Sequence, residues 1–143
     1  MKRILFLPAI LLFFIACKKS NTEQPSSRTL LMSHKWYYQK FSQDGNLIPF
    51  NYCDTNNYLL FFDGGKGGIG NDNAACYGKT GILTSFFYTY NTDSNIIHIA
   101  NDSGNNFTWQ VAILNTTTLE VLFTASAPPP TYAPNFDYVY RAK

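Results

Sequence analysis

The chain has 143 residues, enough for one domain with a hydrophobic core but short for two. Charged residues make up only 14% of it, and its formal net charge is +2. Without the basic Lys2 and Arg3 near its start, nine basic residues face nine acidic ones. A chain this close to neutrality gains little from counterion release, which excludes nucleic acid as an expected partner.

The N-terminal segment predicts export from the cytoplasm. Lys2 and Arg3 precede thirteen mainly apolar residues, Ile4 to Ala16. A membrane-spanning helix needs about 20 apolar residues, whereas the apolar part of a secretory signal peptide has about 7 to 15 after a basic start. We therefore predict a signal peptide over residues 1–16.

The small Ala16 directly before Cys17 resembles the lipobox of bacterial lipoproteins. This resemblance implies that the signal peptide is removed and that Cys17 receives acyl chains, palmitate among them, which attach the protein to a membrane. Lipoproteins without an aspartate after the cysteine usually belong to the outer membrane, and here Lys18 and Lys19 follow. The expected location is therefore the periplasmic face of the outer membrane. The alternative is an ordinary signal peptide that ends at Cys17.

The rest of the chain divides into a tether and a domain. Polar residues dominate the stretch after the cysteine, so residues 17–28 are predicted to be the lipidated cysteine and a flexible tether. Residues 29–143 suit a single domain. Aromatic residues are 17% of the chain, and Asn, Thr and Ser supply much of its polarity, a composition that favours strands and turns over helices.

Short apolar runs bounded by polar turns predict eight strands in this domain. The predicted strands cover residues 34–41, 47–50, 58–62, 81–90, 96–100, 107–113, 118–124 and 136–141. Ser26 and Ser27 before Leu30 predict one short capped helical turn, and no helix of three turns is expected after it. This spacing of strands is typical of an all-β fold, an antiparallel meander closed as a barrel or sandwich.

Alternation along the strands predicts which side chains share a face. It places Trp36 and Tyr38 on one face of the first strand and Tyr37 on the other. Further sets predicted to share a face are Ile82 with Phe86 and Tyr88, Phe107 with Trp109, Val111 and Ile113, and Leu119 with Val121 and Phe123. His98 is predicted on the wetter face of its strand, where histidine is more often a plain polar residue than a catalyst.

The glycine-rich stretch from Asp63 to Gly68 has the composition of a phosphate-binding loop but not its pattern. Such a loop ends in Gly-Lys-Ser/Thr and leads into a helix, whereas Ile69 and Gly70 follow here. The stretch is therefore interpreted as a glycine hairpin with residues at positive φ.

Two cysteines remain when Cys17 is assigned to lipid. Cys53 and Cys76 form an even pair in a compartment expected to be oxidising, so they are predicted to form a disulfide. Closing a loop of this length contributes about 3 kcal/mol in the chain-entropy model. The alternative is a metal or redox pair, but neither cysteine belongs to a Cys-X-X-Cys motif and no histidine is nearby in sequence.

Taken together, these residues resemble the lipocalin-like lipoproteins of Gram-negative bacteria. The matching residues are Leu30, Leu31 and Trp36 for the helix and first strand, Cys53, Phe61, Phe62, Asp63, Gly64 and Gly67 for the first cysteine and glycine hairpin, Cys76 for the second cysteine, and Thr118 and Leu119 for a late strand. The resemblance implies an up-and-down β-barrel of about eight strands. It also implies a basic residue near the last strand that packs on the Trp36 indole, for which Arg141 is the candidate.

Chemistry-bearing motifs are scarce. The chain has two histidines, His34 and His98, and lacks the Gly-X-Ser-X-Gly, His-Glu-X-X-His and paired-carboxylate signatures of hydrolases. We therefore expect no enzyme activity, no cofactor and no metal site.

The aromatic side chains have three possible roles. In the first role, one set of inward side chains fills a small barrel. In the second role, the same side chains line a cup for a small apolar ligand. This set is Trp36, Tyr38, Phe86, Tyr88, Phe107, Trp109, Val121 and Phe123. In the third, exposed tyrosines offer flat surfaces to a glycan or a protein. These are Tyr52, Tyr77, Tyr132 and Tyr138.

The expected function is noncatalytic binding of a small apolar ligand by a lipid-anchored barrel. The alternative is a solid barrel that acts through its loops as an envelope interaction module or protein inhibitor, with a protein partner that the sequence leaves open. Cavity volume separates the two, since a ligand carrier is expected to have an internal pocket of about 300 Å³ or more.

Overall fold

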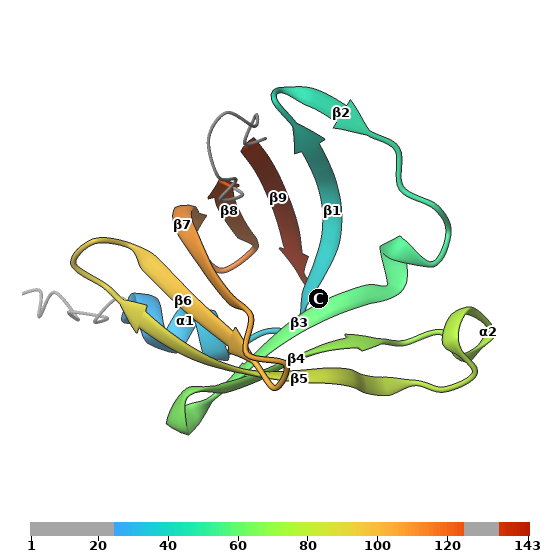
Figure 1. Cartoon of the computed structure of the whole chain (residues 1–143), viewed down its shortest axis with the longest axis horizontal. Coiled ribbons are helices and arrows are strands. Elements are labelled where there is room, and N and C mark those ends of the chain that lie inside the picture. Colours follow the sequence, from blue (N-terminus) through green and yellow to red (C-terminus); the bar gives the residue numbers. More distant parts are fainter. Residues whose placement is uncertain (1–24, 125–134) are drawn as a thin grey trace, which may run out of the picture.

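A computed structural model describes residues 25–124 and 135–143. These residues form a closed antiparallel barrel of eight strands with one extra strand and two short helices (Figure 1). The helices are α1 (Ser27–Met32) and α2 (Ala74–Tyr77), and short 3-10 turns cover Asp54–Asn56 and Asp63–Gly65. The strands are β1 (Trp36–Gln43), β2 (Asn46–Ile48), β3 (Asn57–Phe62), β4 (Lys66–Asn71), β5 (Gly81–Asn91), β6 (Ile96–Asn101), β7 (Asn106–Leu114), β8 (Thr118–Thr124) and β9 (Asn135–Ala142).

Some predicted features lie outside the described residues. These are the signal peptide over 1–16, the lipid attachment at Cys17 and most of the tether. Within the described part of the chain, neither α1 nor α2 has the length and apolar character needed to cross a bilayer.

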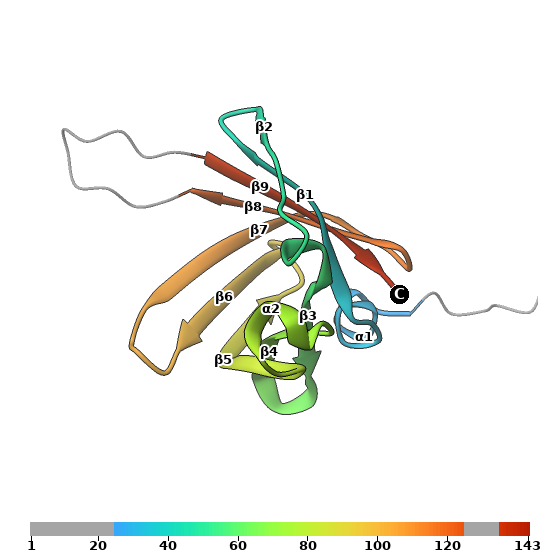
Figure 2. The same ribbon diagram turned by 90° about the vertical axis from the view of Figure 1, so that its right-hand side faces the viewer.

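The barrel is a meander that closes on its first strand. From β3 to β9 each strand pairs with the next, and β9 pairs with β1 (Figure 2). On its other edge β1 is shared, because Trp36 and Tyr37 pair with β3 while the segment from Phe41 to Gln43 pairs with β2. The short β2, which Pro49 follows, is therefore an extra edge strand, and only two residue pairs join β1 to β3.

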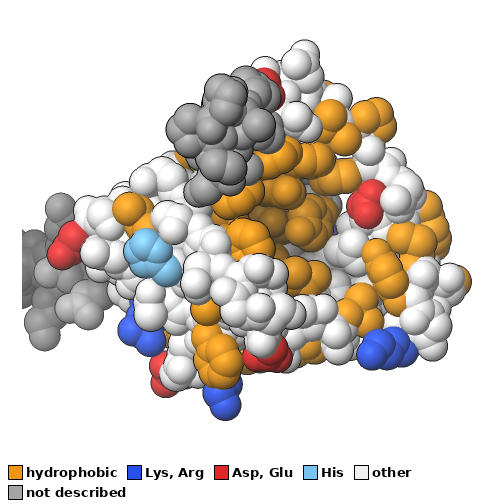
Figure 3. Space-filling view, in the orientation of Figure 1, with side chains coloured by type: hydrophobic (Ala, Val, Ile, Leu, Met, Phe, Trp, Pro, Cys, Tyr) orange, Lys and Arg blue, Asp and Glu red, His pale blue; other side chains and the backbone are white. Residues whose placement is uncertain are grey.

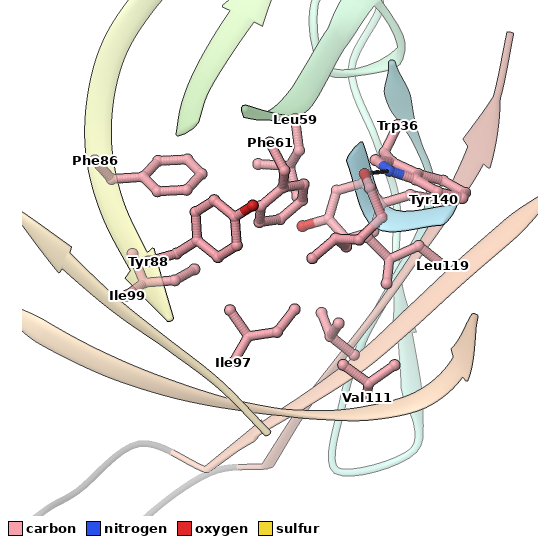
Figure 4. Close-up of a cluster of buried hydrophobic side chains, with 12 residues drawn as sticks. Trp36, Leu59, Phe61, Phe86, Tyr88, Ile97, Ile99, Val111, Leu119 and Tyr140 are labelled. Carbon is pink, nitrogen blue, oxygen red and sulfur yellow. Dashed lines mark hydrogen bonds between the residues drawn. The ribbon is translucent and has the colours of Figure 1, made fainter. Parts of the chain in front are cut away.

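One end of the barrel is filled. Its core is a cluster of inward side chains from most strands (Figure 4). The buried members are Leu31, Trp36, Leu59, Phe61, Phe86, Tyr88, Ile97, Ile99, Val111, Leu119, Val121 and Tyr140. The α1 helix covers this end, which we call the closed end. Its N-cap Ser26 accepts a hydrogen bond from the backbone of Thr29, as the capped turn predicted, and Trp36 Nε1 donates to the Leu31 carbonyl at 2.8 Å.

The glycine-rich stretch contains a strand that the sequence did not predict. Gly64 and Gly65 have φ of +77° and +74° and form the expected turn, but the residues after them form β4 rather than a loop. A Cβ at Gly67 would collide with the ring of Phe86, and one at Gly70 with the ring of Tyr58. Glycine is thus required here because aromatic rings from neighbouring strands lie over the backbone.

Two predicted inward side chains point outward. A register shift between β4 and β5 places Ile82 on the outer face, where it is 41% exposed. A second shift, between Val111 and Ile113 on β7, leaves Ile113 42% exposed, while Leu114 packs on the core instead. One extra residue on one strand of a pair inverts the alternation beyond it, which is why both predictions are wrong.

Arg141 does not pack on the Trp36 indole. In the β1–β9 register Arg141 lies opposite Tyr37, on the outer face, and its guanidinium donates to Thr118 Oγ1 at 3.2 Å. The indole is contacted instead by the His34 ring, whose centroid lies 5.3 Å away with the two planes nearly perpendicular.

A polar cluster spans the narrow β1–β3 junction on the outside of the barrel. The Tyr37 hydroxyl donates to the Asp72 carboxylate, and Lys35 Nζ lies 3.1 Å from Asp72 Oδ1. The hydrogen bond from Tyr37, followed by contact with Lys35, holds the pKa of Asp72 below its usual value. Burial and the same hydrogen bond raise the pKa of Tyr37, which is only 7% exposed despite lying on the outer face.

The disulfide between Cys53 and Cys76 is present, with the two Cα atoms 5.5 Å apart. Cys53 lies in the connection between β2 and β3, and Cys76 lies in α2, between β4 and β5. The bond therefore joins two connections at the end of the barrel opposite α1. We call this the open end. Both sulfur atoms are used in this bond, so neither is a free thiolate that could bind a metal ion.

Candidate functional site

The open end of the barrel contains an apolar cavity of about 220 Å³. Figure 3 shows it as a hollow whose wall is formed largely by hydrophobic side chains. The lining residues come from β1 and from β4 to β9: Tyr38, Ile69, Thr84, Ser85, Phe86, Ile99, Asn101, Phe107, Trp109, Phe123, Tyr138 and Tyr140. Seven of the twelve side chains are aromatic, so a ligand here would contact mainly ring faces and edges.

Aromatic side chains from β1 and β9 form one wall of the cavity. Tyr38 on β1 lies directly opposite Tyr140 on β9, and their ring centroids are 4.7 Å apart. Tyr138, two residues earlier on β9, packs on Tyr140 with nearly parallel ring planes at 6.4 Å. The period of two along a strand places such side chains on one face, which is why both tyrosines of β9 face the interior.

A second hollow of about 310 Å³ adjoins this cavity, since Tyr38 and Tyr138 line both. Its other lining residues come from β1, the last residue of β2, the β2–β3 connection and the first residue of β3: Phe41, Ile48, Pro49, Phe50, Asp54 and Asn57. It lies where β1 leaves β3 and pairs with β2 instead. The split of β1 between two partners thus leaves additional space beside the cavity.

The volume of this cavity is smaller than the roughly 300 Å³ expected for the internal pocket of a ligand carrier. It exceeds the roughly 150 Å³ engineered cavity that holds one benzene molecule. Its size therefore fits a substituted single ring or a compact two-ring molecule. The barrel is neither solid nor wide enough, within this cavity, for a long acyl chain.

The cavity lining carries no charged side chain among the described residues. Burial raises the pKa of Tyr38 and, more strongly, that of Tyr140; the Tyr38 phenol raises the pKa of Tyr140 further, whereas the Tyr140 phenol partly offsets the rise at Tyr38. Both side chains are therefore neutral hydrogen-bond donors at physiological pH. Asn101 is used elsewhere, because its Oδ1 accepts the backbone N–H groups of Ser103 and Asn105.

The Tyr140 hydroxyl is the unusual polar group of this region. Tyr140 is 0% exposed, and its Oη has no hydrogen-bond partner among the described residues. Figure 4 shows the ring extending from β9 with its oxygen directed into the barrel interior. Buried hydroxyl groups are usually hydrogen-bonded, so an unpaired one beside a cavity indicates a group suited to bind something there.

Five of the eight side chains predicted to line a ligand cup do line the cavity. They are Tyr38, Phe86, Phe107, Trp109 and Phe123. The other three, Trp36, Tyr88 and Val121, belong to the filled core below it. Strand alternation assigned all eight to the interior but contained no information on depth, since residues on one face of a strand can lie at either end of the barrel.

Sequence reasoning missed several lining residues, among them Ile69, Ile99, Tyr138 and Tyr140. Tyr138, which we predicted to be an exposed tyrosine, lines the cavity instead, and burial raises its pKa. The alternation of Phe136, Tyr138 and Tyr140 along the last strand was a usable signal for β9. Tyr52 and Tyr77 are 73% and 48% exposed, as expected for surface tyrosines, and Tyr132 lies outside the described residues.

Groups suited to catalysis or metal binding do not gather in the described part of the chain. No three His, Cys, Asp or Glu side chains there lie close enough to hold a metal ion. His98 is exposed on the outer face of β6, as alternation predicted, and its Nδ1 is 3.2 Å from Thr108 Oγ1. The cavity is therefore the feature of the described residues best suited to a function.

Comparison of the chain with protein-family models gives no match, and comparison with curated proteins gives none either. The functional argument consequently depends on the geometry of the barrel and on the residues of its cavity.

Proposed function

We propose that this protein is a lipid-anchored, noncatalytic binding protein of the outer membrane whose barrel holds a small, mainly apolar ligand. The observation that supports binding is the aromatic cavity of about 220 Å³ at one end of an otherwise filled barrel. Burial of apolar ligand surface against such a wall contributes about 25 cal/mol per Å². The absence of a catalytic cluster among the described residues is compatible with simple binding.

The proposed anchor is Cys17, for which the lipobox-like Ala16-Cys17 pair and the apolar segment before it are the support. The described chain begins beside α1, at the closed end of the barrel. A tether attached at that end leaves the cavity mouth at the opposite end, away from the attachment point. A membrane-bound barrel in this orientation remains open to molecules in the surrounding periplasm.

Native mass spectrometry tests this proposal. The chain from Ser20 to Lys143, which contains every described residue, is exported to a bacterial periplasm and purified without detergent. We expect a bound mass of roughly 100 to 200 Da, by scaling from benzene in a 150 Å³ cavity, or more if the ligand extends into the second hollow. This mass should be lost on unfolding.

A pair of variants assigns the bound mass to the cavity. Ile69→Trp enlarges a lining side chain and should abolish the bound mass. Ile82→Trp makes the same change on the outer face, where Ile82 is 41% exposed, and should retain it. Loss in both variants would indicate a general effect of tryptophan on the fold. If the unmodified chain carries no bound mass and takes up no added ring compound, the cavity is not a binding site, and the interaction module becomes the better hypothesis.

A further inference from the structure

The following inference rests on the proposed function and specifies its ligand. We propose that the cavity selects an uncharged ring compound carrying one hydrogen-bond acceptor, such as a carbonyl oxygen, and that the phenols of Tyr38 and Tyr140 bind this acceptor. The remainder of the ligand lies among the aromatic rings of the open end. Three observations on the cavity lead to this assignment.

The first observation is the unpaired donor. Tyr140 Oη is fully buried, belongs to a side chain that lines the cavity and forms no hydrogen bond of normal geometry with a described residue, although the Tyr38 phenol lies near enough to raise its pKa. The neighbouring Tyr38 side chain lines both the cavity and the second hollow. A ligand acceptor beside this pair of phenols would satisfy a hydroxyl that the protein itself leaves unsatisfied.

The second observation is the absence of charge. None of the twelve lining residues, all of them described, is Lys, Arg, Asp or Glu. A carboxylate or ammonium group placed in this cavity would lose its hydration without gaining an opposite charge, which is strongly unfavourable. Neutral phenols donate one hydrogen bond each but do not compensate a full charge. The cavity should therefore reject anions such as fatty acids when the charged group has to enter it.

The third observation is size and wall chemistry. A volume of about 220 Å³ is about half as large again as the cavity that accepts benzene, and seven of the lining side chains are aromatic. Aromatic walls favour a planar ring through offset-stacked and edge contacts. A flexible chain would lose more conformational entropy on entering the same space.

Three probe molecules of equal size separate the contributions of the hydrogen-bond acceptor, the charge and the apolar ring. Acetophenone has a carbonyl acceptor, α-methylstyrene has a methylene group in the same place, and benzoate carries a negative charge; all three have the same number of non-hydrogen atoms. Binding is measured by titration calorimetry with the chain from Ser20 to Lys143, which contains α1, all nine strands and the disulfide of the closed barrel. We expect acetophenone to bind about fivefold more tightly than α-methylstyrene, and benzoate to show no binding.

Removal of single hydroxyl groups assigns the effect to the phenols. At least one of the single variants Tyr38→Phe and Tyr140→Phe should bind acetophenone about fivefold more weakly than the unmodified chain. The affinity of that variant for α-methylstyrene should change by less than about twofold. Tyr52→Phe, which removes a hydroxyl from a side chain that is 73% exposed and distant from the cavity lining, is the matched control and should change neither.

The free protein provides an independent measurement. Because the Tyr140 hydroxyl forms no hydrogen bond of normal geometry with a described residue, Tyr140→Phe should leave the melting temperature unchanged or raise it. A fall of more than about 4 °C would show that the hydroxyl already has a partner within the protein, which overturns the inference.

The remaining outcomes separate this inference from the proposed function. If acetophenone and α-methylstyrene bind equally and no phenol variant distinguishes them, the inference is wrong while ligand binding by the cavity stands. Tighter binding of benzoate than of acetophenone likewise overturns the inference alone. If no probe binds and no ligand accompanies the purified chain, both the inference and the proposed function fail.

Discussion

The two ends of the barrel are built from the same strands but differ in how their interiors are used. At the closed end, Trp36, Leu59 and Leu119 are 0% exposed and α1 covers them. At the open end, Phe107 is 37% exposed, and the half-buried Trp109 stands at the edge of a cavity. Figures 1 and 2 show α1 against one end only, with the strand pairs extending past it at the other.

This difference shows that a side chain can face the barrel interior without being packed on all sides by other side chains. Both ends have apolar residues at alternate positions, yet among residues 25–124 and 135–143 only the closed end has an element inserted across it. Leu31 of α1 is fully buried among the core side chains and accepts a hydrogen bond from Trp36 through its carbonyl. Because no described element covers the open end in this way, the aromatic rings there surround a space that they do not fill.

The largest expected effect compares the only two tryptophans of the chain, Trp36 and Trp109. Trp36→Ala removes a fully buried ring from the closed end and should lower the free energy of unfolding by about 4 kcal/mol. Trp109→Ala changes a half-buried ring beside an existing cavity, so we expect less than half of that loss. Urea unfolding followed by circular dichroism measures both values on the chain from Ser20.

Trp36→Phe serves as a milder companion, because it keeps a ring in the filled core while losing the hydrogen bond to the Leu31 carbonyl. Its destabilisation should lie between those of the two alanine variants. Equal losses for Trp36→Ala and Trp109→Ala would contradict the distinction between a filled end and an open one.

The next effect concerns what holds the open end together. Replacing both Cys53 and Cys76 by serine removes the bond that joins two connections there, across a sequence separation of 23 residues. The chain-entropy model gives a loss of about 3 kcal/mol. Hydrogen exchange on the same variant should show faster opening of β2, η1 (Asp54–Asn56) and α2 than of the end of β7 and the start of β8, which lie at the closed end. Uniformly faster exchange would show that the disulfide acts on the whole barrel instead.

The smallest effect is the pH dependence of the β1–β3 junction. The Tyr37 hydrogen bond, with Lys35 nearby, lowers the pKa of Asp72 in the folded state, so its stabilising contribution is present above the ordinary pKa of aspartate and is lost as pH falls through the lowered value. Asp72→Asn should therefore flatten the decrease in stability below about pH 4. Both Lys35 and Asp72 are about two-fifths exposed, so the change is expected to be small. Urea midpoints at several pH values, with Asp93→Asn as the control, measure it.

Much of the fold could be predicted because local chemistry is sufficient for it. The capped turn at Ser26, the first strand with Trp36 inward, and the pairing of Cys53 with Cys76 all follow from short-range patterns that the structure confirms. The outward position of His98 follows from alternation alone.

The errors have a common cause in contacts between strands. The strand β4 was missed because glycine disfavours strands, and here Gly67 is needed because the Phe86 ring and the Leu60 carbonyl of neighbouring strands leave no room for a Cβ. Ile82 and Ile113 were placed on the wrong face because bulges depend on how two strands pair. None of these contacts is visible within one strand.

By itself the sequence determined that this protein is an all-β domain with about eight strands, an aromatic interior and one disulfide, because periodicity, turn residues and cysteine number are local properties. Only the tertiary structure decided that α1 fills one end, that Tyr38, Tyr138 and Tyr140 meet beside a cavity at the other, and that the Tyr140 hydroxyl is left unpaired there. These features depend on the depth of each side chain along the barrel, and depth is set by the register of strands that are far apart in the chain.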